Sequence, residues 1–432
     1  MKQISYIKIF RFWIPLAATW LMMSLEGPFL AAVIARLADP KYNLAAYGIA
    51  FSFALIVEAP IIMIMSASVA LVAGGDSFRK LKRFTYYLNS IITAGMVICL
   101  VPPVFYFITQ DLIGLPRDIA RITYVACLIL LPWPSAIGYR RFFQGILIRR
   151  NLTRRVAYGT AIRVSAMAAA AIVFSNLEVR GAYVGASSLT IGVFCEAITS
   201  RIMVHKSLGE VLKINESEKE RITYASILKF YYPLALTAIL FLGVHPFVTF
   251  FMGISRFPIE SFAALPVVNG LVFIFRGLGL SFQEVGVALL GNRFEAYKPL
   301  RNFAFLLGAA MTACLVIIAF TPAAAFWYRR VSGLSVELSR FSYLPTQIMF
   351  LLPGLTVWIS FQRATLIMGK KTGPITGATL TEVMLIVAVL FASVQFYDVV
   401  GIVGAAAAYL IGRLGANFYL IPSCAQVVRR FK

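Results

Sequence analysis

The stretch FWIPLA, at Phe12–Ala17, returns later in the chain as FYYPLA, at Phe230–Ala235. The two copies are separated by 218 residues, the spacing of Pro15 and Pro233. The same register continues without gaps to about Val72, and later segments match with small gaps. The chain is therefore an internal repeat, which predicts two halves of similar fold.

Composition sets the class of protein. The chain has 432 residues, of which 60% are hydrophobic and 13% are charged, whereas soluble domains carry about 25% charged residues. Apolar runs of roughly 20 residues, each long enough to cross a bilayer, number about twelve. We predict an all-α polytopic membrane protein made of two six-helix bundles, residues 1–205 and 224–432, with a polar linker at 206–223.

The charge pattern predicts the orientation of these spans. The net charge of +22 comes from Lys and Arg in the turns between apolar runs. These residues favour alternate turns, which is the positive-inside pattern and not the basic patch of a nucleic-acid-binding protein. We expect both termini to be cytoplasmic, in a plasma membrane that would be the inner membrane of a bacterium.

Other motifs argue against enzyme chemistry. The five cysteines show no CxxC pair, the two histidines form no cluster, and there is no phosphate-binding GxxxxGK[ST] loop. We therefore expect a monomer with no catalytic residues, no metal and no cofactor, whose partners are lipids and a solute.

Each half has an even number of predicted spans, so the two repeats keep the same orientation in the membrane. Parallel repeats of this kind are typical of transporters that alternate access to a site between the halves. A membrane protein that transports nothing, such as a scaffold or a receptor, is an alternative class, but it would not need such a repeat.

Charged residues inside the spans are candidates for the site, because charge in a bilayer is costly and is usually functional or paired. Glu58 and Arg276 are mates in the repeat, since 58 + 218 = 276. We predict that they form an ion pair between the halves, with Glu58 able to take up a proton and Arg276 acting in gating or substrate binding. The alternative is that each pairs within its own half.

Three further residues are candidates for ion coupling. Glu284 follows Arg276 by about two helical turns, on much the same face. Glu26 and His245 lie at matched positions in the first and seventh spans, beside Pro28 and Pro246. Imidazole titrates near neutral pH, but the pattern favours His245 as a hydrogen-bonded packing residue over a coupling group. Both prolines are expected to break their helices.

The remaining intramembrane charges fall into two groups. We predict structural pairs within each half, Arg163 with Glu196 and Arg363 with Glu382. The second group, a possible set of substrate or gating contacts, consists of Arg140, Arg141 and Arg413. Arg140 and Arg141 could instead extend toward the cytoplasmic face, and Arg413 could pair with Glu382.

The openings FWIPLA and FYYPLA, RRFFQG at residues 140–145 and the Gly/Ala-rich starts of the sixth and twelfth spans resemble the multidrug/oligosaccharidyl-lipid/polysaccharide (MOP) exporter superfamily. The resemblance covers nearly the whole chain and implies a MATE-like fold. It also implies export or flipping driven by a proton or sodium gradient. RFWIPLA, AAYGIAFS and FYYPLAL look most similar to the progressive ankylosis branch, which is associated with exporting pyrophosphate, nucleotides or citrate-like anions. Glu26 lies on the span where proton-driven members carry an acidic site, but the motif around it does not match.

The sequence thus predicts an ion-coupled exporter of a small organic solute. A lipid-linked saccharide flippase is the alternative and would need a cationic cavity for pyrophosphate. The candidate charges Glu26, Glu58, Glu284 and Arg276 are net acidic, which argues against it. That balance reverses if the three arginines of the second group face the cavity.

Overall fold

The computed structural model describes residues 5–150, 152–214, 216, 222–291, 294–369, 371 and 373–430. This part of the chain is helical throughout, apart from turns and one isolated β-bridge between Arg256 and Val400. It forms two compact units. The central unit is Leu37–Phe250, and the terminal unit combines Met1–Arg36 with Phe251–Lys432.

The helices of the central unit are α2 (Pro40–Glu58), α3 (Ile64–Leu71), α4 (Gly75–Cys99), α5 (Pro102–Tyr106), the π-helix η1 (Phe107–Leu112), α6 (Arg117–Leu130), α7 (Trp133–Arg149), α8 (Thr153–Asn176), α9 (Gly181–Leu212), α10 (Tyr224–Leu242) and most of α11 (Val244–Gly253).

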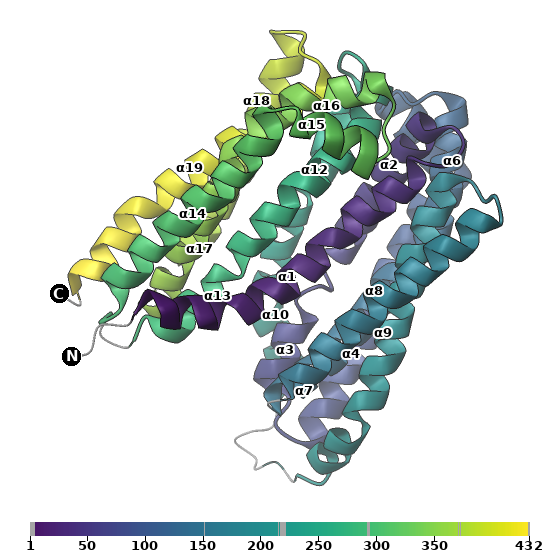
Figure 1. Ribbon diagram of the computed structural model, residues 1–432. Coiled ribbons are helices and arrows are strands. Elements are labelled where there is room, and N and C mark those ends of the chain that lie inside the picture. Colours follow the sequence, from purple (N-terminus) through teal and green to yellow (C-terminus); the bar gives the residue numbers. More distant parts are fainter. Residues whose placement is uncertain are drawn as a thin grey trace. The chain divides into compact units, whose positions relative to one another are not determined.

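The helices of the terminal unit are α1 (Tyr6–Ile34), α12 (Pro258–Leu280), α13 (Phe282–Leu289), α14 (Tyr297–Phe320), α15 (Ala323–Ala325), the π-helix η3 (Phe326–Val331), α16 (Val336–Ile348), the 3₁₀-helix η4 (Met349–Leu351), α17 (Leu352–Met368), α18 (Gly373–Gln395) and α19 (Gly401–Arg430) (Figure 1).

Ten helical stretches in the described residues are long and apolar enough to cross a membrane. An eleventh is the pair Gly75–Cys99 and Pro102–Leu112, bent by 72°, if the two count as one span. The sequence also predicts a span over residues 43–74, but the structure has two separate helices there, α2 and α3. Pro60 lies in the break, where its missing N–H and its ring disfavour a continuous helix. The polytopic helical class is confirmed, and twelve spans remain a prediction.

The repeat is visible in the backbone. Asp39 and Phe257 are mates at the 218-residue spacing, and both adopt a left-handed conformation, with φ of 48° and 53°. Each is followed by a proline, Pro40 or Pro258, in the first turn of a helix, where a missing N–H costs no hydrogen bond. The two halves therefore start their second helix in the same way.

The repeat also places equivalent caps. The Asn43 side chain accepts a hydrogen bond from the Ala182 N–H at the start of α9, at 3.1 Å. Its mate Ser261 accepts one from the Ile402 N–H at the start of α19, also at 3.1 Å. Free N–H groups at helix starts need such acceptors, so both long helices are fixed to their unit by the same device.

The units differ from the predicted halves in the first helix of each half. The helix α1 packs along α12 and α13 in the terminal unit, and α10 packs on α2, α3 and α4 in the central unit (Figure 1). The predicted division into 1–205 and 224–432 does not include this exchange. Sequence similarity reveals that two first helices exist, but not which copy of the bundle each one packs against.

Part of the predicted linker is held on the central unit. Glu216 Oε1 accepts hydrogen bonds from the Ser77 N–H at 2.9 Å and the Ser77 hydroxyl at 2.6 Å. Lys80 Nζ donates to the Ile222 carbonyl at 3.1 Å. The linker thus caps the start of α4, while its residues 215 and 217–221 lie outside the described residues.

The two prolines predicted to break helices behave differently. Pro28 lies inside α1, which continues through it to Ile34, so this prediction was wrong. Pro246 lies in the first turn of α11, and the helical break falls at Gly243, just before it. A proline disturbs the turn that precedes it, and a neighbouring glycine makes a break there easier.

Candidate functional site

Glu196 on α9 is the centre of a buried polar cluster in the central unit. Its side chain is fully buried and pairs with the Arg140 guanidinium from α7. Arg163 Nε from α8 lies 3.5 Å from Glu196 Oε2. Gln144 Nε2 donates to Oε1 at 2.9 Å, and the Thr160 hydroxyl lies 3.4 Å from the same oxygen. The predicted Arg163–Glu196 pair is present, but Arg140 is the closer partner.

Glu58 belongs to the same group of charges, which we call the central cluster: Glu58, Arg140, Arg141, Arg163 and Glu196. Glu58 is the last residue of α2, is 4% exposed, and interacts electrostatically with the three arginines. Arg141 is half-buried and contacts Met65 Sδ at 3.8 Å. The break at Pro60 thus places a carboxylate at a helix end among guanidinium groups.

A second cluster lies in the terminal unit. Arg413 on α19 pairs with Glu382 on α18, with Nη2 and Oε1 2.9 Å apart, and both side chains are buried. Arg276 on α12 and Arg363 on α17 interact electrostatically with both members of this pair. We call these four residues and Tyr409, which interacts with Arg276, the terminal cluster.

The terminal cluster corrects one predicted pair. Glu382 pairs with Arg413 and not with Arg363, which is a neighbour of that pair. The reason is the arrangement of helices: α18 and α19 pack side by side along much of their length, whereas α17 and α18 touch only briefly. Glu58 and Arg276 each have charged neighbours within their own unit, and an ion pair between the two remains a prediction.

The two clusters carry opposite charges at related positions. Glu58 on α2 corresponds to Arg276 on α12, at the spacing of 218 residues. The central cluster has three arginines and two glutamates, and the terminal cluster has three arginines and one glutamate. Both clusters are net positive. The acidic balance expected from the sequence counted Glu26 and Glu284, which belong to neither cluster, and it stays a prediction.

The other coupling candidates lie outside these clusters. Glu26 is half-buried in α1 of the terminal unit, and His245 is half-buried in α11 of the central unit. Their joint action stays a prediction. Glu284 is exposed and is hydrogen-bonded by Trp20 of α1. Arg276 lies in α12 and Glu284 in α13, on either side of the turn at Ser281, and their placement on one helix face stays a prediction.

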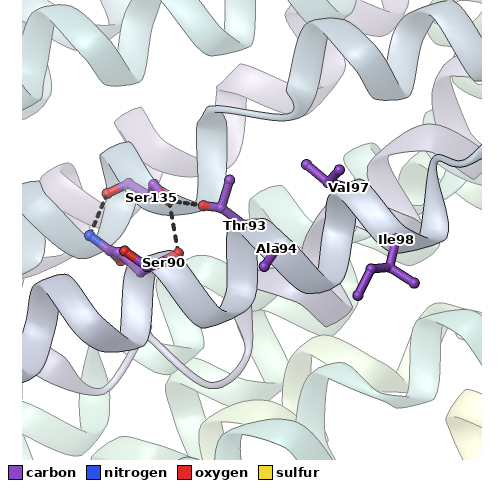
Figure 2. Close-up of a pocket in the computed structure, with 7 residues that line it drawn as sticks. Ser90, Thr93, Ala94, Val97, Ile98 and Ser135 are labelled. Carbon is purple, nitrogen blue, oxygen red and sulfur yellow. Dashed lines mark hydrogen bonds between the residues drawn. The ribbon is translucent and has the colours of Figure 1, made fainter.

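A groove of about 570 Å³ lies between α4 and α7 of the central unit. Its polar side is formed by Asn89, Ser90, Thr93 and Ser135 (Figure 2). Asn89 Nδ2 donates to the Ser135 carbonyl at 3.2 Å, and the Thr93 and Ser135 hydroxyls lie 2.5 Å apart. These groups bond mainly to one another, so the groove presents a largely apolar surface with a short polar strip.

Three polar residues at the clusters, namely Tyr409 and the Glu196 contacts Gln144 and Thr160, were not predicted from the sequence. Gln144 follows Arg140 by four residues on α7, and Tyr409 precedes Arg413 by four residues on α19. Residues four apart share a helix face, so this spacing could have identified both. Thr160 gave no such signal, because its contact to Glu196 depends on how α8 and α9 pack.

Comparisons with solved structures identify the fold. A MATE family multidrug-resistance transporter of the MOP superfamily, in an inward-facing conformation, matches with a TM-score of 0.77 and 14% identity over 96% of this chain and 98% of its own. The lipid II flippase MurJ matches with a TM-score of 0.74 and 15% identity, over 97% and 90%.

A third match is a MOP superfamily transporter from Pyrococcus furiosus, whose binding pocket is described as having reverse polarity. Its TM-score is 0.68 at 13% identity, over 100% of this chain and 99% of its own. No protein-family model and no curated protein sequence matches the chain.

These findings define an integral membrane protein with a polytopic helical fold. More particularly, the fold is the MATE-like fold of MOP superfamily transporters, as the sequence resemblance predicted. Since the identities are 13–15%, the likeness establishes the fold and leaves the ankylosis-like branch a prediction.

Proposed function

We propose that this protein is an ion-coupled secondary-active exporter that moves a small organic anion out of the cytoplasm by alternating access. The observation that carries the proposal is the pair of buried charge clusters, placed at repeat-related positions within a MATE-like fold. Buried charges in a membrane protein are costly to keep unless they bind, couple or move. In alternating access, one repeat moves against the other around a fixed site, and the internal repeat of this chain provides two such units.

The net positive clusters favour an anionic solute. Arginine binds carboxylate and phosphate through two parallel hydrogen bonds, and it keeps its charge in a buried site. The central cluster adds a carboxylate, Glu58, among three arginines. We assign Glu58 to the coupling proton or sodium ion and the arginines to the solute. Both termini are proposed to be cytoplasmic, in the plasma membrane.

The test is transport by the purified chain in proteoliposomes. Citrate, ATP and pyrophosphate would be compared with an organic cation such as ethidium, under imposed proton or sodium gradients. Uptake of one or more anions that depends on a gradient supports the proposal. Uptake of the cation alone would overturn the assignment of an anionic solute.

A lipid-linked saccharide flippase is the second candidate, supported by the likeness to MurJ and by the positive clusters. In the same vesicles, translocation of a fluorescent polyprenyl-pyrophosphate saccharide without transport of soluble anions would favour the flippase.

A further inference from the structure

The terminal cluster contains more positive charge than its own carboxylate can balance. Arg413 pairs with the single carboxylate of Glu382, and Arg276 and Arg363 interact electrostatically with this pair. Arg413 is 3% exposed and Glu382 is 7% exposed. A buried guanidinium needs an opposite charge and hydrogen-bond acceptors to offset its lost hydration. One carboxylate serves Arg413 and leaves the two half-buried guanidinium groups of Arg276 and Arg363 to be balanced.

The hydrogen-bond donors of the cluster are also incompletely used. Within the described residues, the buried Nε atoms of Arg276, Arg363 and Arg413 have no hydrogen-bond partner, whereas the Tyr409 hydroxyl interacts with the Asn269 side chain. Native interiors satisfy nearly all buried polar groups. Among the same described residues Glu382 Oε2 is also without a partner, so unpaired Nε donors from three arginines on α12, α17 and α19 stand against this one oxygen of the cluster's carboxylate.

The repeat explains how the imbalance arises. In the central unit, the position related to Arg276 is Glu58, which gives that cluster a second carboxylate. Glu196 there also engages two arginines and Gln144. The terminal unit thus has the guanidinium of Arg276 where the central unit has the carboxylate of Glu58. The second carboxylate or phosphate that would balance the terminal arginines must then come from a bound ligand.

We propose that the terminal cluster is an oxyanion-binding site that takes a carboxylate or phosphate group, with Arg276 and Arg363 as its ligands. Glu382 holds Arg413 in place beside them, and the Tyr409 hydroxyl adds a donor. The planar fork of arginine fits two oxygens of one group. This proposal rests on the proposed function, since the bound oxyanion would be the charged group of the exported solute.

Binding of inorganic phosphate to the detergent-purified full chain tests the site. Thermal unfolding and calorimetry would be recorded with sodium phosphate and with sodium chloride at matched ionic strength. Phosphate should stabilise the wild type saturably, because a ligand of the folded state raises stability. Loss of a charge-assisted contact in Arg276→Gln should weaken apparent affinity about tenfold to hundredfold.

Controls separate this effect from damage to the fold. Arg256, in the same unit, is exposed and pairs loosely with Asp398 at 3.7 Å, so Arg256→Gln should bind phosphate like the wild type. Without phosphate, Arg276→Gln should unfold at the same temperature as the wild type or a higher one, because a like charge beside Arg413 is removed. Arg363→Gln should weaken binding as Arg276→Gln does.

The source of the oxyanion is tested with mixed micelles containing phosphatidate. Saturable binding of free phosphate that is lost in Arg276→Gln indicates a soluble anion, and binding of phosphatidate alone with the same loss indicates a lipid headgroup. Binding by neither, or equal binding by wild type and Arg276→Gln, overturns the site. The binding assays use no ion gradient, so their result is independent of the transport assay. Transport that persists although neither phosphate nor phosphatidate binds refutes the site alone. Binding of phosphate or phosphatidate without any transport refutes the proposed function.

Discussion

The Tyr231 hydroxyl of α10 donates a hydrogen bond to the Pro60 carbonyl, 2.6 Å away, at the break that follows α2. A related contact occurs in the terminal unit, where Trp13 Nε1 of α1 donates to the Ser281 hydroxyl at 2.8 Å and also reaches the Leu278 carbonyl at 3.3 Å. Trp13 and Tyr231 are repeat mates, and so are Pro60 and Leu278. Each first helix is therefore anchored, through an equivalent bond, to the bundle formed by the other half of the sequence.

This anchor predicts the effect of removing one hydroxyl. Tyr231→Phe keeps the ring in its apolar site and leaves the Pro60 carbonyl unpaired, which should lower the free energy of unfolding by about 1 kcal/mol. Unfolding in detergent would be followed by circular dichroism. Tyr232→Phe is the matched control, because Tyr232 is 63% exposed on the same helix. Equal stability of the two variants would contradict the anchoring role.

The buried ion pairs of the central cluster make a larger prediction. Glu196→Gln leaves Arg140 and Arg163 without their carboxylate and should destabilise the protein by about 3–5 kcal/mol, since a buried charge loses its partner. Thermal unfolding of the purified variant measures this. Glu210→Gln, at an exposed position of the same helix, should stay within about 0.5 kcal/mol of the wild type. A small effect of Glu196→Gln would mean that the cluster is open to water.

Glu58 is predicted to couple transport to the ion gradient. Glu58→Gln should fold normally, because it removes a charge at the end of α2 without changing size. Gradient-driven uptake should fall by about tenfold or more, which corresponds to about 1.4 kcal/mol in the barrier to transport. Exchange of labelled for unlabelled solute, which needs no gradient, should continue.

Two results would count against this role. Full gradient-driven uptake by Glu58→Gln would remove Glu58 from coupling, and loss of both uptake and exchange would move it to solute binding. Glu337→Gln, at an exposed position of α16, serves as the control for both assays.

The contact between the linker and α4 predicts a local effect on stability. Glu216→Ala removes the acceptor for the Ser77 N–H and hydroxyl, and loss of a helix cap costs about 0.5–2 kcal/mol. A double-mutant cycle with Ser77→Ala, measured by thermal unfolding, isolates the interaction. Simple additivity of the two single effects would show that the contact contributes nothing to stability.

Composition and the repeat were enough to predict several features of this protein. Apolar runs of bilayer length can only be spanning helices, because lipid offers no partner for free backbone groups. Ten spans, or eleven with the bent pair, correspond to predicted ones, and the resemblance in short motifs predicted the MATE-like fold. The pair Arg163 and Glu196 followed from similar depth in two adjacent helices.

Only the tertiary structure decided which residues form the clusters. The closer partner of Glu196 is Arg140, and the partner of Glu382 is Arg413. These choices depend on the rotation and packing of whole helices, which the spacing of residues along one helix does not fix. The exchange of the first helices is of the same kind. Both α1 and α10 are apolar around most of their surface, and such helices can pack against either copy of a repeated bundle. Contacts such as Tyr231 to Pro60 and Trp13 to Leu278 form only once that choice is made.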